Sequence, residues 1–397
     1  MKAELLAPAG TLECVKTALY FGADAVYCGG PLLQLRAESS ALSFDEIEFA
    51  ASLCHKMGKK LYITVNCFAE NGEIPQLKDY ASRLKEIGAD ALIVSDLGAI
   101  AELREKCPEM DIHVSTQANT MNYRTVNFYR DMGVKRVVLG REMTLKQIEE
   151  LKGLIHSDIE IEAFVHGAMC MAYSGRCLLS SFLTNRSGNR GECSQPCRWN
   201  YYLVEEKRGN MHIPVIEDAG ATAILSSADL KCIGFLDRLE NAGVCSFKIE
   251  GRMKSPYYVA TVINAYRQFM DGRAGLKVCE EELNCASHRP YSSGFYFGDV
   301  KNDPNNDGLY RRTCDFIGIV CGKTEKDEYI IEMRNRFSVG DVLEVLSPNS
   351  LGRSFKVESI RGENGESKNA AVLVQEKIAV NCPFELESGD ILRKRIV

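Results

Sequence analysis

The chain has 397 residues, of which 45% are hydrophobic and 26% are charged, and its formal net charge at pH 7 is −6. This composition is typical of a folded globular protein and excludes an intrinsically disordered chain. The length predicts one large domain and one smaller domain. The acidic balance argues against a protein that coats nucleic acid through a broad basic face.

The sequence contains no apolar stretch that approaches the roughly 18 residues of a membrane-spanning helix. Its N-terminus runs directly into a strand-like segment rather than a signal peptide, so we expect a cytoplasmic protein with no membrane partner. The 16 cysteines are then reduced thiols rather than a disulfide framework. Most of them are single and lie in apolar runs, where we expect buried side chains, as at Cys14, Cys245 and Cys321.

Short apolar runs alternate with amphipathic, helix-like segments along the first two thirds of the chain. Segments such as 77–87 and 123–132 have apolar residues three and four positions apart, which suits helices packed on a parallel sheet. Eight such strands predict an α/β fold, a (β/α)8 TIM-like barrel, rather than an open doubly wound sheet. The predicted strands are 4–10, 25–30, 60–67, 91–96, 111–118, 136–142, 159–167 and 246–252.

The interval between the seventh and eighth predicted strands is much longer than the others. We interpret 168–245 as an insertion that carries four clustered cysteines and a hairpin-like stretch at 200–215. Loops that follow the strands form the catalytic face of such barrels, so the insertion should cover the barrel mouth. The turn-rich segment 301–308 reads as a linker. We therefore predict a barrel domain over 1–310 and, from short alternating segments, a small β-barrel domain over 311–397.

Several predicted strands carry polar residues on one face, which should point into the barrel and line a polar pocket. Buried polar groups without partners cost about 1 to 3 kcal/mol each, so these groups must pair with one another or bind a polar ligand. An internal network, for example of Glu160 and Glu162 with Lys248, is the alternative for the deeper residues. An arginine at a strand end can grip a carboxylate or phosphate with two hydrogen bonds. The predicted pocket residues are Asn66, Gln117, Arg141, His166, Lys248, Glu250 and Arg252.

The clustered cysteines are Cys170, Cys177, Cys193 and Cys197, with the spacing Cys-x6-Cys-x15-Cys-x3-Cys. Structural zinc sites usually use tighter Cys-x2-Cys pairs, whereas four thiolates suit either zinc or an iron-sulfur cluster. Spacing alone leaves zinc, an iron-sulfur cluster and unrelated thiols as open interpretations. His166 lies four residues before Cys170, which raises a Cys–His protease dyad as a weaker hypothesis, because no orienting Asn or Asp is recognisable.

Longer motifs carry a resemblance to a known family. The run EAFVHGAMC at 162–170, continued by AYSGRCLLS at 172–180, resembles the signature of the collagenase-like peptidase U family, family thirty-two. The motifs LLAPAG at 5–10, STQAN at 115–119 and KIEGRMK at 248–254 extend this resemblance over nearly the whole chain. The segment that begins at Cys193 and the motif FSVGD at 337–341 resemble the tRNA-hydroxylating members in particular.

This resemblance implies that Cys170, Cys177, Cys193 and Cys197 hold an iron-sulfur cluster, of the 4Fe-4S type. It also implies an enzyme that hydroxylates the wobble uridine of tRNA to 5-hydroxyuridine, without molecular oxygen and in dependence on prephenate. The implied partners are the tRNA anticodon loop and prephenate as a co-substrate, and a paralogous partner subunit is a further candidate. The resemblance assigns no catalytic residue.

The residues fit this expectation physically. Prephenate has two carboxylates, and Arg141, Lys248 and Arg252 would supply fixed positive charge at the barrel mouth. A wobble base lies in a single-stranded loop and can enter a recessed pocket at a low unstacking cost. Residues 170–210 contain six cations and three anions, which suits anticodon-stem phosphates. The alternatives are hydroxylation of ribosomal RNA or of a quinone ring, a collagenase-like peptidase, and a noncatalytic RNA-binding accessory protein.

Overall fold

The computed structural model describes residues 1–35, 41–170, 172–199, 228–298, 310–348 and 350–396, and the backbone of two short strands between 199 and 228. The chain forms two compact units, and each unit is built from three separate segments of the sequence. The first unit comprises Met1–Leu19, Ala23–Lys254 and His288–Tyr310, and the second comprises Tyr20–Gly22, Ser255–Ser287 and Arg311–Val397. Residues 255–287, which we predicted as part of the barrel domain, thus group with the C-terminal residues. The predicted linker at 301–308 lies outside the described residues.

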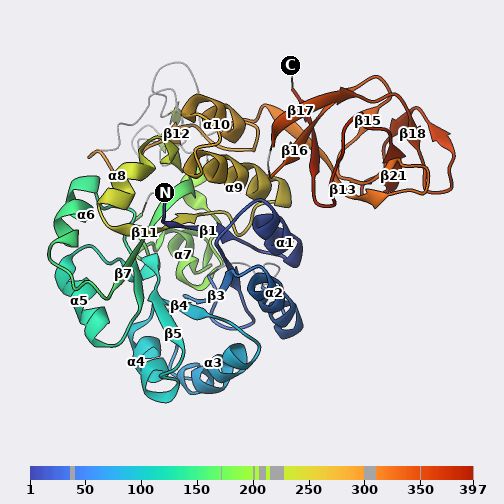
Figure 1. Ribbon diagram of the computed structural model, residues 1–397. Helices are drawn as coiled ribbons and strands as arrows, with labels where there is room; N and C mark the ends of the chain where they lie inside the picture. The colour runs from blue at the N-terminus through green and yellow to red at the C-terminus, as the bar shows by residue number, and fades with distance from the viewer. Residues whose placement is uncertain are drawn as a thin grey trace. The chain divides into compact units, whose positions relative to one another are not determined.

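The first unit contains a closed barrel of eight parallel strands (Figure 1). The last of these strands closes the ring by pairing in parallel with both the first and the seventh. Each strand coincides with one of the eight predicted segments, so the predicted (β/α)8 barrel is confirmed. The strands are β1 (Glu4–Pro8), β2 (Ala25–Gly29), β3 (Lys60–Val65), β4 (Ala91–Val94), β5 (Asp111–Val114), β6 (Arg136–Val138), β7 (Glu160–Ala168) and β11 (Val244–Ile249).

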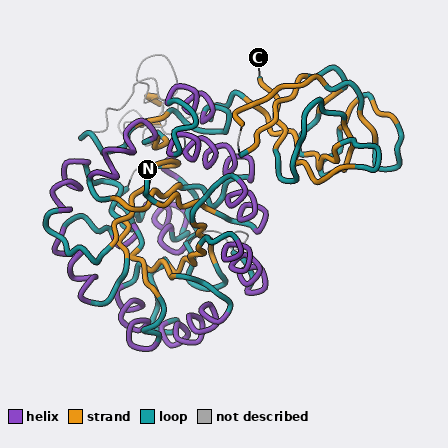
Figure 2. Tube along the Cα trace, viewed as in Figure 1, coloured by secondary structure: helices purple, strands orange, loops and turns teal. Residues whose placement is uncertain are grey.

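Helices cover the outside of this ring of strands, as Figure 2 shows. Strand β4, with the sequence ALIV, is apolar on both of its buried faces, whereas β5, β7 and β11 alternate apolar with polar residues. Local sequence also sets the helix starts: Ser43 and Glu46 form a reciprocal capping box at the second helix. The helices are α1 (Leu12–Tyr20), α2 (Phe44–Lys56), α3 (Leu77–Glu86), α4 (Leu97–Lys106), α5 (Tyr123–Asp131), α6 (Leu145–Lys152) and α8 (Leu236–Asn241).

The predicted insertion follows β7 and contains short elements. Strands β8 (Tyr202–Val204) and β9 (His212–Pro214) pair antiparallel, which confirms the predicted hairpin. Strand β10 (Asp229–Lys231) then returns antiparallel to the end of β7, and β12 (Tyr291–Ser292) pairs with β10 in parallel. Before these strands the insertion contains α7 (Leu179–Thr184) and two 3-10 turns, η4 (Gly188–Arg190) and η5 (Pro196–Arg198).

The second unit combines two helices, α9 (Pro256–Met270) and α10 (Leu276–Leu283), with antiparallel sheets. Its eight-stranded sheet has the order β17-β16-β22-β13-β14-β21-β18-β19, and β15 pairs separately with β20. The strands are β13 (Cys314–Lys323), β14 (Tyr329–Met333), β15 (Phe337–Ser338), β16 (Val342–Ser347), β17 (Ser350–Lys356), β18 (Ile360–Arg361), β19 (Ser367–Lys368), β20 (Ala370–Ala371), β21 (Lys377–Val380) and β22 (Ile391–Arg395).

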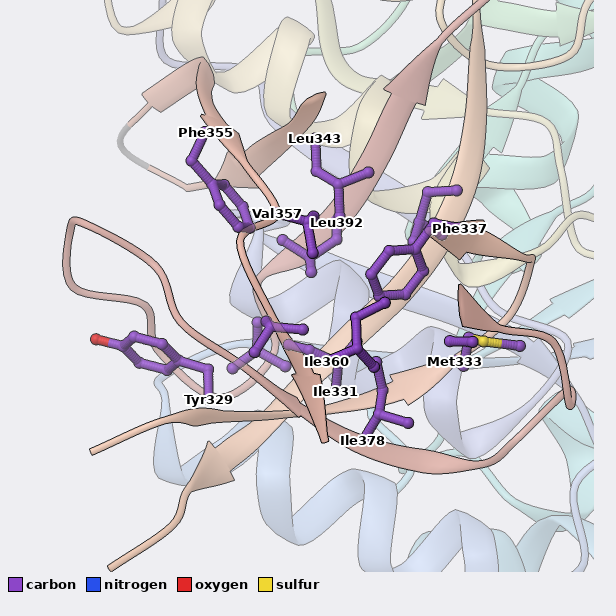
Figure 3. Packing of buried hydrophobic residues seen from close by; sticks show 14 of the residues in the cluster. Tyr329, Ile331, Met333, Phe337, Leu343, Phe355, Val357, Ile360, Ile378 and Leu392 are labelled. Atoms are coloured by element: carbon purple, nitrogen blue, oxygen red, sulfur yellow. The ribbon is translucent and has the colours of Figure 1, made fainter. Parts of the chain in front are cut away.

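One apolar core fills the β part of the second unit. Phe337, Leu343, Phe355 and Leu392 are among its buried members, and their side chains converge from different strands in Figure 3. This packing agrees with the predicted C-terminal β domain. In the described part of the chain, no helix combines the length and the apolar character that crossing a bilayer requires.

Candidate active site

A polar pocket lies inside the barrel at the carboxyl ends of the strands. It is partly open to solvent. Six of the seven predicted pocket residues line it, namely Asn66, Gln117, Arg141, Lys248, Glu250 and Arg252. The remaining lining residues are Tyr27, Leu35, Thr64, Ile93, Ser115, Thr116, Val138 and Phe164. Thr64 and Ser115 lie on strand faces that the sequence showed to be polar. Phe164 and Tyr27 are aromatic, and nothing in the sequence indicated that they line the pocket.

Arg141 follows β6 and is fixed on three sides. Its Nη2 donates to Glu250 Oε2 at 3.2 Å, and its Nη1 donates to the carbonyl oxygen of Ala168 at 3.1 Å. The guanidinium carbon lies 4.1 Å from the centroid of the Phe164 ring, a cation–π contact. Its Nε is buried and finds no acceptor among the residues that the structure describes. A buried donor without a partner is costly, so this group would gain from an acceptor on a ligand.

Arg252 contacts the opposite side of the pocket. Its Nη1 donates to Thr64 Oγ1 at 2.7 Å and to Gln34 Oε1 at 3.3 Å. The same nitrogen lies so close to Gly29 that a Cβ there would stand 2.8 Å from it. A side chain at Gly29 would therefore require the ends of the Arg252 and Gln34 side chains to shift. Nearby, Asn66 accepts a hydrogen bond from the Leu35 backbone through Oδ1 at 3.0 Å.

A buried ion-pair network lies beneath the pocket. Glu162 is fully buried and accepts from Lys248 Nζ at 2.7 Å and from Arg136 Nη1 at 3.1 Å. Burial alone would raise the pKa of Glu162, but the two cations outweigh it and lower that pKa. Burial lowers the pKa of Lys248, and the nearby carboxylates of Glu162 and Glu250 offset this only in part. The predicted Glu162–Lys248 pair is thus present, whereas Glu160 pairs with Arg136 instead, at 2.7 Å.

The first strand contributes a carboxylate to this network that the sequence analysis missed. Glu4 Oε1 accepts from Arg136 and, at 2.9 Å, from Ser246 Oγ. The Tyr62 hydroxyl donates to Glu4 Oε2 at 2.8 Å. Burial and the neighbouring Glu4 raise the pKa of Tyr62 and keep its hydroxyl protonated. The sequence did contain a signal for this role, because Glu4 is a charged residue at the start of a strand that was predicted to belong to the barrel.

His166 does not line the pocket, although strict alternation along β7 would place it there. Lys248 and Ile249 of β11 pair with Phe164 and His166, so Val165 is an extra residue, and such a bulge redirects the side chains that follow it. The His166 ring lies 5.4 Å from the ring of Tyr291 in β12. Burial, followed by nearby cationic groups, lowers its pKa to about 3.

The insertion is anchored to loops at the pocket mouth. The Ser174 backbone donates to Glu142 Oε1 at 2.8 Å, beyond the end of β6. Gly175 has a φ of +71°, and a Cβ there would lie 2.1 Å from the carbonyl oxygen of Gln117, so this approach requires glycine. Arg190 donates to Glu73 at 2.7 Å, in the loop after β3. The insertion therefore covers the ends of several strands, as predicted.

The four clustered cysteines differ in exposure from most of the other twelve. Cys170 and Cys193 are exposed, and Cys177 and Cys197 are half-buried. Burial raises the pKa of Cys197, and Cys170, Cys193 and Cys177 raise it further, so these three thiols lie within electrostatic range of Cys197. As donors they suit a metal or cluster, but no three His, Cys, Asp or Glu groups among the described residues converge in a ligating arrangement.

Most single cysteines are buried, as expected. Nine of the twelve are buried, among them Cys14. The expectation is wrong for Cys321, which is exposed, and Cys245 is only half-buried. Cys321 lies in β13 where its pairing with β14 shifts register between Val320 and Gly322, and the sequence does not reveal such a shift or which face of a strand is covered.

The fold and the pocket together define a class of protein: a (β/α)8 barrel whose charged interior pocket is covered by a cysteine-bearing insertion after the seventh strand. Residues 10–306 match the model of peptidase family U32, and residues 312–393 match the model of the peptidase family U32 C-terminal domain. The chain belongs to peptidase family U32.

Relatives in this family have different names. The tRNA hydroxylation protein P of Escherichia coli strain K12 is 37% identical over an alignment of 415 positions, which covers 92% of this chain and 90% of that protein. The 23S rRNA 5-hydroxycytidine C2501 synthase of the same organism is 38% identical, covering 68% of this chain and 39% of that protein. A collagenase of Porphyromonas gingivalis is 33% identical, covering 74% and 73%.

Proposed function

We propose that this protein is an RNA-modifying enzyme that hydroxylates tRNA, converting the wobble uridine to 5-hydroxyuridine in a prephenate-dependent reaction that needs no molecular oxygen. The observation that carries the proposal is the 37% identity to a tRNA hydroxylation protein along 92% of this chain, which includes the second unit. The 23S rRNA 5-hydroxycytidine synthase is similar to a smaller part of this chain, 68%, so tRNA is favoured as the substrate.

The pocket has the chemistry that a dicarboxylate requires. Arg141 and Arg252 approach it from different strands and are held by neighbouring side chains, so their charges are positioned before a ligand binds. Such preorganised cations stabilise bound or developing negative charge without reorganisation. Tyr27 and Phe164 add aromatic surface to the pocket lining, and Lys248 and Arg141 lie over their rings at 4.3 and 4.1 Å.

The cysteines of the insertion are proposed to hold an iron-sulfur cluster. Cys170, Cys177, Cys193 and Cys197 supply the four thiols that a 4Fe-4S cluster needs, and the cluster would provide electron transfer when bound. The rest of the insertion orients this site, because Ser174 and Arg190 tie it to the loops around the pocket.

A peptidase is the competing function, because one relative is named a collagenase. Among the described residues, the pocket lining contains neither cysteine nor histidine, and Lys248 is held by Glu162. The Ser115 hydroxyl accepts from the Gln117 backbone at 3.3 Å. No lining group therefore has the base-activated geometry of a protease nucleophile.

Nucleoside mass spectrometry of tRNA from a deletion strain tests the proposal. Loss of 5-hydroxyuridine in that strain and its recovery with the wild-type gene are expected. Cys170→Ser and Cys193→Ser should fail to restore it, and the purified variants should lose visible iron-sulfur absorption under anaerobic conditions. Cys321→Ser, an exposed thiol of the second unit, is the matched control and should restore both signals. Unchanged tRNA in the deletion strain would overturn the proposal.

Prephenate dependence is tested on the two pocket arginines. Arg141→Lys and Arg252→Lys keep the charge but lose the planar fork of donors, so each should raise the prephenate concentration needed for half-maximal modification by about tenfold. Arg238→Lys on α8 is a control outside the pocket. If both pocket variants keep the wild-type prephenate response, the carboxylate assignment is wrong.

A further inference from the structure

The insertion exposes an unusual set of apolar and aromatic side chains. Phe182 is 86% exposed, Leu178 71%, Tyr173 61% and Trp199 45%. All four lie within 172–199, the same segment that carries three of the four clustered cysteines. Exposed apolar side chains that gather in one segment commonly mark an interaction surface. We call these four residues the aromatic platform.

The platform is held by a rigid framework. Leu178 immediately precedes α7, and the backbone N–H of Phe182, four residues later, donates to its carbonyl oxygen, which brings the two residues one helical turn apart. Ser194 links this helix to the segment before η5 through Ser180 at 3.1 Å and Thr184 at 3.0 Å. Trp199 ends that 3-10 turn, so the platform spans elements that are hydrogen-bonded together.

The segment that carries the aromatic platform also has an excess of positive charge. Residues 172–199 contain four arginines and one glutamate, a net charge of +3, in a chain whose formal net charge is −6. Arg190 is engaged by Glu73. Arg176 and Arg186 are exposed and form no ion pair with any residue that the structure describes. Aromatic rings interleaved with available cations are the combination that binds single-stranded nucleic acid.

We propose that the aromatic platform stacks unpaired RNA bases next to the base that enters the pocket, while Arg176 and Arg186 contact the phosphates. This inference rests on the proposed function and names the part of the tRNA that the insertion reads: a single-stranded loop rather than a duplex. A duplex hides its base faces, so rings such as Phe182 can stack only on splayed bases. An apolar protein partner would not require the excess of arginine.

Trp199 provides a direct readout, because it is the single tryptophan of the chain. Its fluorescence should be quenched when the holoprotein is titrated with an anticodon stem-loop RNA that contains the wobble uridine. An RNA duplex of the same length and charge should quench it less and bind more weakly. Equal quenching and affinity for the two RNAs would overturn the inference.

Variants separate stacking from charge. Phe182→Ala should weaken binding of the stem-loop about fivefold or more and leave the salt dependence of binding unchanged, because stacking releases no counterions. Arg186→Ala should instead reduce the slope of log affinity against log salt by about 0.7. Phe128→Ala on α5, a ring that is 51% exposed, is the matched control and should bind like the wild type.

The outcomes distinguish this inference from the proposed function. If the wild type modifies tRNA but Phe182→Ala keeps full affinity and rate, only the aromatic platform is refuted. If Phe182→Ala changes the sedimentation of the protein and leaves RNA affinity intact, the platform is a protein interface and the inference is wrong. If tRNA from the deletion strain is unchanged, the proposed function itself fails.

Discussion

At the scale of single residues, Glu162 connects the stability of the barrel to its pocket. Its carboxylate is fully buried, but its two cationic partners, Lys248 and Arg136, outweigh burial and lower its pKa. Burial lowers the pKa of Lys248 more than the nearby carboxylates raise it, and the like charge of Arg136 lowers it further. Removal of Glu162 would leave Lys248 buried without its carboxylate.

We predict that Glu162→Gln destabilises the protein by about 3 to 5 kcal/mol, the usual effect of breaking a buried ion pair on one side. Glu160→Gln is the control: Glu160 also pairs with Arg136, but 36% of its side chain is exposed, so a loss below about 1 kcal/mol is expected. Urea unfolding followed by circular dichroism measures both. Equal losses for the two variants would contradict a special role for Glu162.

The same pair predicts a pH dependence. Because the pKa of Glu162 is lower in the folded than in the unfolded protein, its contribution to stability is full above the unfolded value and is lost as the pH falls through the folded value. The stability difference between wild type and Glu162→Gln should therefore be largest near neutral pH and shrink on acidification. A difference that grows below pH 4 would exclude this linkage.

At the scale of secondary-structure elements, a single arginine of the second unit connects two strands and a helix. Arg393 of β22 is fully buried and donates through Nη2 to Glu282 of α10 at 2.9 Å and through Nε to Glu344 of β16 at 3.0 Å. In the same unit, Asn264 of α9 donates to the carbonyl oxygen of Ser347 at 3.2 Å. These polar contacts explain why α9 and α10 group with the β sheets rather than with the strands that precede them.

We predict that Arg393→Ala destabilises the second unit by about 3 to 5 kcal/mol, because two carboxylates lose their buried cation. Hydrogen exchange should show lost protection in β13, β16 and β22, with the barrel strands unchanged. Arg395→Ala is the matched control, since Arg395 also pairs with Glu344 but its side chain is 54% exposed. A uniform loss of protection over both units would refute the assignment of Arg393 to the second unit.

At the scale of the whole molecule, long-range closure creates the pocket. β11 pairs with β1 and β7, and this closure brings Arg252 next to Thr64, 188 residues away in sequence. Arg141 and Glu250 meet across 109 residues in the same way. The insertion then adds the thiols and the aromatic platform above strand ends that come from distant parts of the chain.

The sequence by itself determined the eight strands, the position of the insertion and six of the fourteen residues that line the pocket. These features follow from local rules, because apolar periodicity marks strands and alternation marks the inward face. It also identified the pairing of Glu162 with Lys248, since both lie on inward faces of strands that are neighbours in a closed barrel.

Only the tertiary structure decided the rest. The bulge at Val165 turns His166 away from the pocket, and a one-residue shift of register leaves no trace in local alternation. The grouping of 255–287 with the C-terminal residues depends on buried polar contacts such as Glu282 with Arg393, which join segments 111 residues apart. The exposure of Phe182 was equally invisible, because an apolar residue in a short helix is expected to be buried until the fold shows what covers it.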